Sequence, residues 1–193
     1  MNTTIQPTVL LVPGLRDHVE QHWQTLLAAD LPRAVTIAPM GRANLDCRAR
    51  VEAIEQAANS IRGPLVIVAH SAGCLMVVHW AQRTRRAVAG ALLAAPPDFE
   101  RPMPEGYPAI EELAANGWLP VPRTRLPFRS IVGASRNDPL ASYACASALA
   151  QDWGSELVDL GEVGHLNPSS GFGPWPPAHD YIEQLAAAAP MRA

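Results

Sequence analysis

"LVIVAHSAGCLMVVHW", residues 65–80, decides the fold, because one apolar run passes directly into another across a serine flanked by small residues. The first run, 65–69, is short and aliphatic, which predicts a strand buried on both faces of a parallel sheet. The second run begins at Ala72 and extends to about Thr84, which predicts a helix that follows the strand without a connecting loop. Ser71 therefore lies at the turn between a central strand and a helix.

The same alternation of short β-branched runs and longer amphipathic stretches continues on both sides of this turn, and it is typical of a parallel sheet covered by helices. The predicted strands span 8–12, 34–38, 65–69, 87–95, 129–135 and 156–161. The predicted helices span 19–31, 45–61, 72–84, 139–152 and 177–189, with a short helical segment at 109–119. We expect an α/β fold, a three-layer α/β/α sandwich around a mostly parallel six-stranded sheet, with residues 1–193 as a single domain.

Composition and charge exclude several classes of function. At 193 residues, with 48% hydrophobic and 17% charged residues, the chain has an ordinary globular composition. A net charge of −3 argues against nucleic acid or an anionic membrane surface as a partner. All 15 basic residues are arginine, which excludes a P-loop lysine, a Schiff-base lysine and a Ser-Lys dyad.

The cysteines and histidines give no metal-binding pattern. Cys47, Cys74 and Cys145 are widely spaced and form no CxxC pair. In "HVEQH", residues 18–22, the acid lies one position too late for a zinc-protease motif, so we expect no metal. The unpaired cysteines suit a reducing compartment, and no signal peptide or membrane span is recognisable, so a soluble cytoplasmic protein is the expectation.

Ser71 has the surroundings of a nucleophile. A direct strand-to-helix turn forces its central residue into a strained conformation, and the residues two positions away must be small because strand and helix pass close together. Here they are Ala69 and Gly73, so the pattern is A-x-S-x-G, close to the G-x-S-x-G of the nucleophile elbow. The alternative is that Ser71 serves only as the N-cap of the helix.

An acid and a histidine follow Ser71 in the chain order of the α/β-hydrolase fold. Asp138 comes directly after the strand at 129–135, and His165 lies in a glycine-flanked loop after the strand at 156–161. We expect Ser71 as nucleophile, His165 as base and Asp138 as the orienting acid of a triad. Asp159 is the rival acid, but it lies within a predicted strand. Local roles for Asp138 as an N-cap and for His165 as a loop histidine are the alternatives.

Acyl transfer also needs hydrogen-bond donors for the developing oxyanion. The N–H of Ala72 is one candidate, and the N–H of Leu15, in the loop after the first strand, is the second. The first and third strands flank the predicted topological switch point, where ligands bind in such sheets. His70 is a candidate for the substrate pocket, with a structural role as its alternative, and Trp118 and Trp175 are expected to offer apolar surface to the substrate.

Residues 96–127 interrupt the regular alternation. They contain eight prolines and only a short helical segment. So long an irregular connection usually covers or borders a site, although it can also be a packed surface excursion.

These residues resemble those of the small α/β-hydrolases that include the retinoblastoma-binding serine hydrolase and YdeN-like bacterial proteins. The resemblance covers nearly the whole chain, and its motifs are "VPGLRDHVEQHWQ" (12–24), "VAHSAGC" (68–74), "SRNDPLAS" (135–142) and "GHLNPSSGFGPWP" (164–176). It implies Ser71, Asp138 and His165 as the triad and a domain without a large cap. It also implies hydrolysis of small carboxylic esters without a cofactor. Arg16 and Asp17 stand in a stretch that is more glycine-rich in other α/β-hydrolases.

The sequence thus predicts a serine hydrolase that takes a small-molecule acyl substrate through an acyl-enzyme route. Two alternatives stay open: a thioesterase or amidase that uses the same site, or a protein-interaction module with a vestigial hydrolase pocket. A protein partner is compatible with either.

Overall fold

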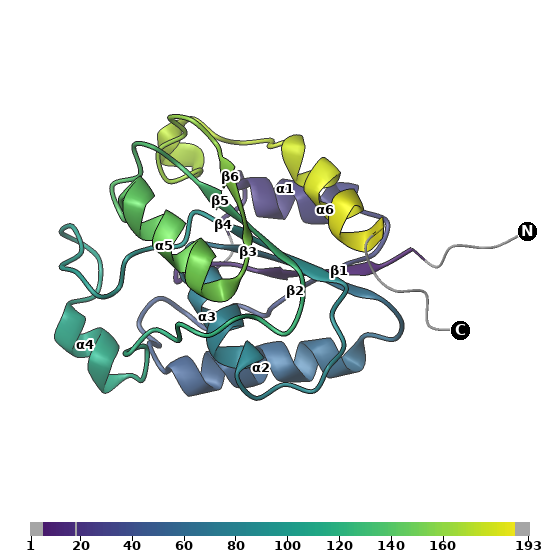
Figure 1. Ribbon diagram of the computed structural model, residues 1–193, viewed down its shortest axis with the longest axis horizontal. Coiled ribbons are helices and arrows are strands. Elements are labelled where there is room, and N and C mark those ends of the chain that lie inside the picture. The colour runs from purple at the N-terminus through teal and green to yellow at the C-terminus, as the bar shows by residue number, and fades with distance from the viewer. Residues whose placement is uncertain (1–5, 18, 188–193) are drawn as a thin grey trace, which may run out of the picture.

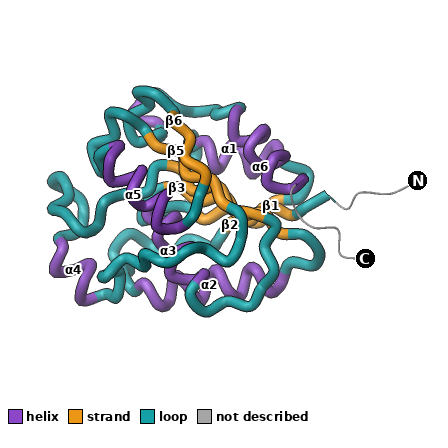
Figure 2. The backbone as a smooth tube through the Cα atoms, viewed as in Figure 1, coloured by secondary structure: helices purple, strands orange, loops and turns teal. Residues whose placement is uncertain are grey.

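The computed structural model describes residues 6–17 and 19–187, and a six-stranded sheet lies at its centre (Figures 1 and 2). The strands are β1 (Thr8–Val12), β2 (Ala34–Thr36), β3 (Leu65–His70), β4 (Gly90–Ala94), β5 (Ser130–Ala134) and β6 (Glu156–Asp159). All neighbouring pairs are parallel, in the order β2-β1-β3-β4-β5-β6. Because the chain goes from β1 to β2 and then continues on the other side of β1 as β3, the switch point lies between β1 and β3.

Helices cover both faces of this sheet. They are α1 (Trp23–Asp30), α2 (Cys47–Ser60), α3 (Ala72–Ala81), α4 (Ile110–Ala115), α5 (Tyr143–Trp153) and α6 (Pro177–Ala187). Helices α1 and α6 pack on one face, and α2, α3 and α5 pack on the other (Figure 1). The predicted three-layer α/β/α sandwich is therefore confirmed, and the sheet is parallel throughout.

Strand β3 shows why the sequence folds this way. All six of its residues are buried, and successive side chains point to opposite faces. Ile67 joins the apolar cluster under α2 and α3, whereas Val66 and Val68 join the cluster under α1 and α6. Full burial of one such aliphatic side chain contributes about 1.5–3 kcal/mol, so a run apolar on both faces belongs at the centre of the sheet.

Helices α1 and α5 each begin four residues later than the sequence predicts. Helix α1 starts at Trp23 rather than at residue 19, because the preceding residues form turns. Helix α5 starts at Tyr143 rather than at residue 139. Ser142 is its N-cap, and Ser142 Oγ accepts the Cys145 N–H at 3.1 Å. The end of the predicted helix at 177–189 lies outside the described residues.

The proline-rich segment 96–127 runs along the outside of the sandwich and holds the short helix α4 (Figure 1). Leu113, Val121 and Leu126 anchor the segment in the core under α2 and α3. The chain thus has a minimal α/β-hydrolase fold, without a large cap between its described strands.

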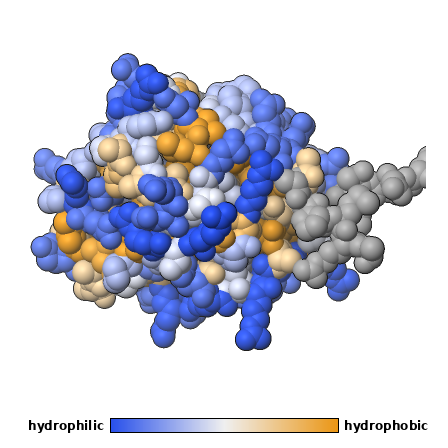
Figure 3. Space-filling view, in the orientation of Figure 1, coloured by the Kyte–Doolittle hydropathy of each residue, from blue (hydrophilic) through white to orange (hydrophobic). Residues whose placement is uncertain are grey.

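On the face shown in Figure 3, polar and charged residues surround smaller apolar areas. Leu26 and Leu157 are the exposed large apolar side chains among the described residues. Within the same ranges, no helix combines the length and apolar character needed to cross a bilayer.

Candidate active site

Ser71 joins β3 to α3 in a strained conformation, with φ 56° and ψ −133°. A non-glycine residue in such a region costs about 1–3 kcal/mol, which the surrounding structure must offset. Gly73 makes the turn possible: a Cβ there would lie 2.2 Å from the Val12 carbonyl oxygen, so α3 passes directly against the end of β1. Ala69, on the strand side, is fully buried, so its methyl group fits at the position where the common motif has glycine. The local structure is that of a nucleophile elbow.

Ser71, His165 and Asp138 meet at the carboxyl edge of the sheet. His165 Nε2 lies 2.8 Å from Ser71 Oγ, and His165 Nδ1 lies 2.8 and 3.0 Å from the two carboxylate oxygens of Asp138. The His165 and Asp138 side chains are only 6% and 3% exposed. With its proton on Nδ1, donated to Asp138, the imidazole presents Nε2 as an acceptor for the serine hydroxyl.

The rival acid lies elsewhere. Asp159 accepts hydrogen bonds from the guanidinium of Arg136, at 2.8 Å from Arg136 Nε. Its side chain is 32% exposed and belongs to a surface ion pair at the end of β6. The structure therefore places Asp138, and not Asp159, beside His165.

Side chains of the acid loop accept hydrogen bonds from backbone N–H groups of the histidine loop. Asn137 Oδ1 accepts the Gly164 N–H at 2.6 Å, and Ser135 Oγ accepts the Val163 N–H at 3.2 Å. Asp138 keeps its own position by accepting the Leu140 N–H at 2.9 Å. The two loops thus hold each other at a fixed separation, a role for Asn137 and Ser135 that sequence reasoning missed.

The two predicted oxyanion donors both line the cavity at Ser71. Ala72 is the first residue of α3, where an amide N–H has no acceptor within its own helix. Leu15 lies in the loop after β1, and within the described ranges its N–H has no hydrogen-bond acceptor. A Cβ on Gly14 would lie 3.1 Å from Ser71 Cβ, so this loop passes immediately beside the serine.

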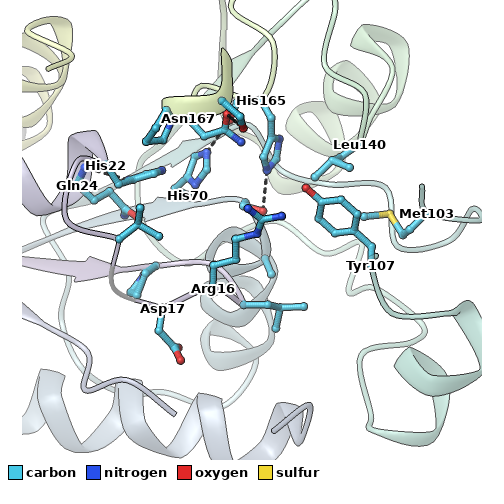
Figure 4. A pocket seen from close by; sticks show the side chains of 18 of the residues that line it. Arg16, Asp17, His22, Gln24, His70, Met103, Tyr107, Leu140, His165 and Asn167 are labelled. Carbon is cyan, nitrogen blue, oxygen red and sulfur yellow. Dashed lines mark hydrogen bonds between the residues drawn. The ribbon is translucent and has the colours of Figure 1, made fainter. Parts of the chain in front are cut away.

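A cavity of about 310 Å³ opens at Ser71 (Figure 4). One side is apolar and comes from the segment 96–127 and the turn before α5: Phe99, Met103, Tyr107 and Leu140. The loops after β1 and β6 form the other side. The volume is at the lower end of the range for small-molecule sites, so it suits a small ligand.

The structure does not bring the two predicted tryptophans into this cavity. Trp118 is fully buried, its indole N–H donates to the Leu45 carbonyl at 2.7 Å, and it packs edge-on behind Phe99. Trp175 lies on the α1 and α6 side of the sheet, where it packs against Trp23 with 4.9 Å between ring centroids. The prediction that these residues contact substrate is wrong, because both rings are packed in the core and neither lines the cavity.

His70 does line the cavity, and its Nε2–H donates to the His165 carbonyl oxygen at 2.9 Å. It therefore also supports the backbone of the histidine loop. The ring is 5% exposed and lies between two other imidazoles, with centroid distances of 4.6 Å to His22 and 4.9 Å to His165.

His22 and Gln24 are site residues that sequence reasoning missed, and His18 lies outside the described residues. His22 Nδ1 accepts the Gln24 N–H as the N-cap of α1. Gln24 Nε2 donates to the carbonyls of Val12 and Val68, at 3.3 and 3.0 Å, and so links the end of β1 to β3. The available signal was that Gln24 lies three residues before Leu27, on the buried face of the predicted helix.

Burial keeps both extra histidines neutral. Desolvation, followed by the nearby His165, lowers the pKa of His22 to about 4. The same effects, with His22 as a further neighbour, lower the pKa of His70 well below its usual range.

Cys74 is fully buried, which raises its thiol pKa, so it is a packing residue rather than a nucleophile. Among the described residues, no group of three or more histidine, cysteine or acidic side chains could hold a metal.

Acidification from about pH 7 to about pH 4 is expected to lower the free energy of unfolding by roughly 3 kcal/mol through His22. The unfolded chain binds a proton at this histidine below its ordinary pKa of 6.5, whereas the folded chain resists protonation until about 4. The free energy of unfolding is thus unaffected by His22 above the ordinary pKa of 6.5, and it falls as the pH drops from there to about 4. Urea unfolding of wild type and His22→Asn at several pH values checks this result. Asparagine retains a capping oxygen without titrating, so identical pH slopes would contradict the assignment.

The fold and the local geometry at Ser71 define the class as an α/β-hydrolase. A sequence model of the family described as "Serine hydrolase" matches residues 9–184. The chain belongs to this serine hydrolase family and is a YdeN-like small member of it, as the sequence resemblance predicts. None of the curated proteins matches the chain.

Solved structures support the same assignment. A YdeN-like hydrolase from Pectobacterium atrosepticum is 33% identical, with a TM-score of 0.77 over 95% of this chain and 91% of that chain. The ydeN gene product of B. subtilis is 17% identical, with a TM-score of 0.73 over 94% of this chain and 99% of that chain. A thermophilic esterase from Thermogutta terrifontis is also 17% identical, with a TM-score of 0.63 over 93% and 90% of the two chains, and shares the fold.

Proposed function

We propose that this hydrolase cleaves small carboxylic esters through an acyl-enzyme formed on Ser71. The observation that carries the proposal is the hydrogen-bonded series Ser71–His165–Asp138 at a cavity of about 310 Å³. A serine hydroxyl is a weak nucleophile until a positioned base removes its proton, and this geometry supplies such a base.

In the first half of the reaction, Ser71 Oγ attacks the ester carbonyl carbon while His165 Nε2 takes the hydroxyl proton. The N–H groups of Ala72 and Leu15 donate to the oxyanion that forms. The carbon–oxygen bond to the alcohol then breaks, and His165 returns its proton to the departing alkoxide. Asp138 holds the imidazole tautomer and stabilises its cationic form.

In the second half, a water molecule takes the place of the alcohol. His165 removes a proton from the water as its oxygen attacks the acyl carbon, and the same two amides receive the oxyanion. The bond to Ser71 Oγ breaks, the serine recovers its proton from His165, and the carboxylic acid leaves. The apolar side of the cavity, formed by Phe99, Met103 and Leu140, accommodates a short acyl chain.

A panel of p-nitrophenyl esters, matched thioesters and anilides, together with a fluorophosphonate probe, tests the proposal. We expect the short esters to be cleaved fastest, because the cavity is small and one of its sides is apolar. The probe adduct should map to the peptide that contains Ser71. Preferential cleavage of thioesters or anilides would reassign the substrate class. A near-zero rate on the whole panel, with no adduct at Ser71, would favour an interaction module instead.

A further inference from the structure

The cavity at Ser71 contains a cation that the ester reaction does not use. Arg16, in the loop after β1, is an exposed residue that lines the cavity. Figure 4 shows its side chain reaching from that loop toward the middle of the cavity, on the side of Tyr107. Its guanidinium carbon lies 5.9 Å from the centre of the Tyr107 ring. In the part of the chain that the structure describes, no carboxylate lies within ion-pair distance of it.

The neighbouring acid does not neutralise this cation. One carboxylate oxygen of Asp17 accepts the N–H groups of Met40 and Gly41, at 3.1 and 2.6 Å, and the other lies 3.4 Å from Arg50. The Asp17 and Arg50 side chains are only 9% and 2% exposed, so the acid is already paired inside the protein. Figure 4 shows Asp17 directed away from the centre of the cavity.

The other polar groups of the lining carry no compensating charge. Burial holds His22 and His70 neutral at neutral pH. Asn167 and Ser169 are uncharged, and Ser169 Oγ donates to Asn167 Oδ1. Among the described lining residues, Arg16 is thus a full positive charge without a carboxylate partner, beside an apolar wall and the reacting serine.

We propose that Arg16 binds a carboxylate on the substrate, so that the preferred substrates are small esters that also carry a free carboxylate group. A guanidinium matches a carboxylate in shape and can donate two parallel hydrogen bonds to it. The Tyr107 ring restricts the guanidinium from one side, and Phe99, Met103 and Leu140 cover the carbon chain between the two ends. This inference rests on the proposed function, because it places the reacting ester at Ser71.

Matched ester pairs test the inference kinetically. The p-nitrophenyl monoesters of glutarate and adipate carry the anion on the acyl side, and their methyl esters are neutral counterparts. On the alcohol side, 4-acetoxybenzoate is paired with its methyl ester. We expect kcat/KM to favour the anionic member of at least one pair about tenfold, and Arg16→Gln to remove that preference. Arg42→Gln, an exposed arginine outside the cavity lining, is the control for loss of one positive charge and should retain the preference.

A binding measurement separates failure of this inference from failure of the proposed function. NMR titrations of Ser71→Ala with monomethyl glutarate, an anion, and with neutral dimethyl glutarate measure affinity without turnover. We expect the anion to bind about tenfold more tightly, and the double variant with Arg16→Gln to bind the two alike. Equal affinities in Ser71→Ala, together with equal kcat/KM within every ester pair, would overturn the inference even if esters are cleaved. If the anion binds more tightly in an Arg16-dependent way but no ester is cleaved, the result would support the carboxylate site and contradict the proposed ester hydrolysis.

Discussion

Replacement of Ser71 by alanine is expected to lower kcat for any cleaved ester by about 10⁶-fold and to abolish fluorophosphonate labelling. The substitution removes the oxygen that forms the covalent bond, while the oxyanion donors and the cavity stay in place. Residual rates should therefore approach those of water attack assisted by binding alone. Steady-state kinetics with p-nitrophenyl butyrate, and labelling followed by mass spectrometry, measure the two effects.

The fold should tolerate this change, because the side chain of Ser71 makes no capping hydrogen bond to α3 and alanine has the same Cβ. Thermal unfolding of the variant should stay close to that of wild type. Ser60→Ala is the matched control: Ser60 is exposed at the end of α2, and its loss should leave kcat unchanged. Undiminished labelling of Ser71→Ala would remove this serine from its assigned role.

Asp138→Asn is expected to lower kcat by about 10⁴-fold with little change in KM. An asparagine amide can donate to His165 Nδ1, which moves the imidazole proton to Nε2 and leaves no acceptor for the Ser71 hydroxyl. The asparagine oxygen can still accept the Leu140 N–H, so the turn before α5 should persist. Kinetics on the same ester, together with circular dichroism, distinguish this chemical defect from a folding defect.

Asp159→Asn is the matched control for that substitution. Asp159 is the last residue of β6 and also lies before His165 in the chain, but its carboxylate pairs with Arg136 at the surface. The variant should therefore retain kcat within about twofold, because this exposed ion pair does not contact His165 and contributes little to stability. A large loss in Asp159→Asn combined with normal activity in Asp138→Asn would invert the assignment of the acid.

The sequence predicts the sheet and the convergence of Ser71, Asp138 and His165 for one physical reason. Parallel strands end at one edge, so a serine, an acid and a histidine that each follow a strand converge there even when they lie far apart in the chain. The elbow adds a local constraint, since only small residues fit where α3 crosses the end of β1, and Gly73 satisfies it.

The pocket walls could not be predicted in the same way. A large apolar residue such as Trp118 or Trp175 has the same pattern in a core as in a substrate pocket, and only three-dimensional packing decides between them. Arg16 and Asp17 pose the reverse problem. Adjacent opposite charges suggest mutual neutralisation, yet the structure turns Asp17 toward Arg50, 33 positions later in the chain.

The Gln24 side chain has a consequence for how ligands bind. Its amide donates to the carbonyls of Val12 and Val68 on the paired strands β1 and β3, so these backbone groups are already satisfied and ordered before any ligand arrives. The entropy lost in ordering this edge is therefore lost during folding rather than on association. A ligand at this edge therefore meets backbone groups that are already ordered.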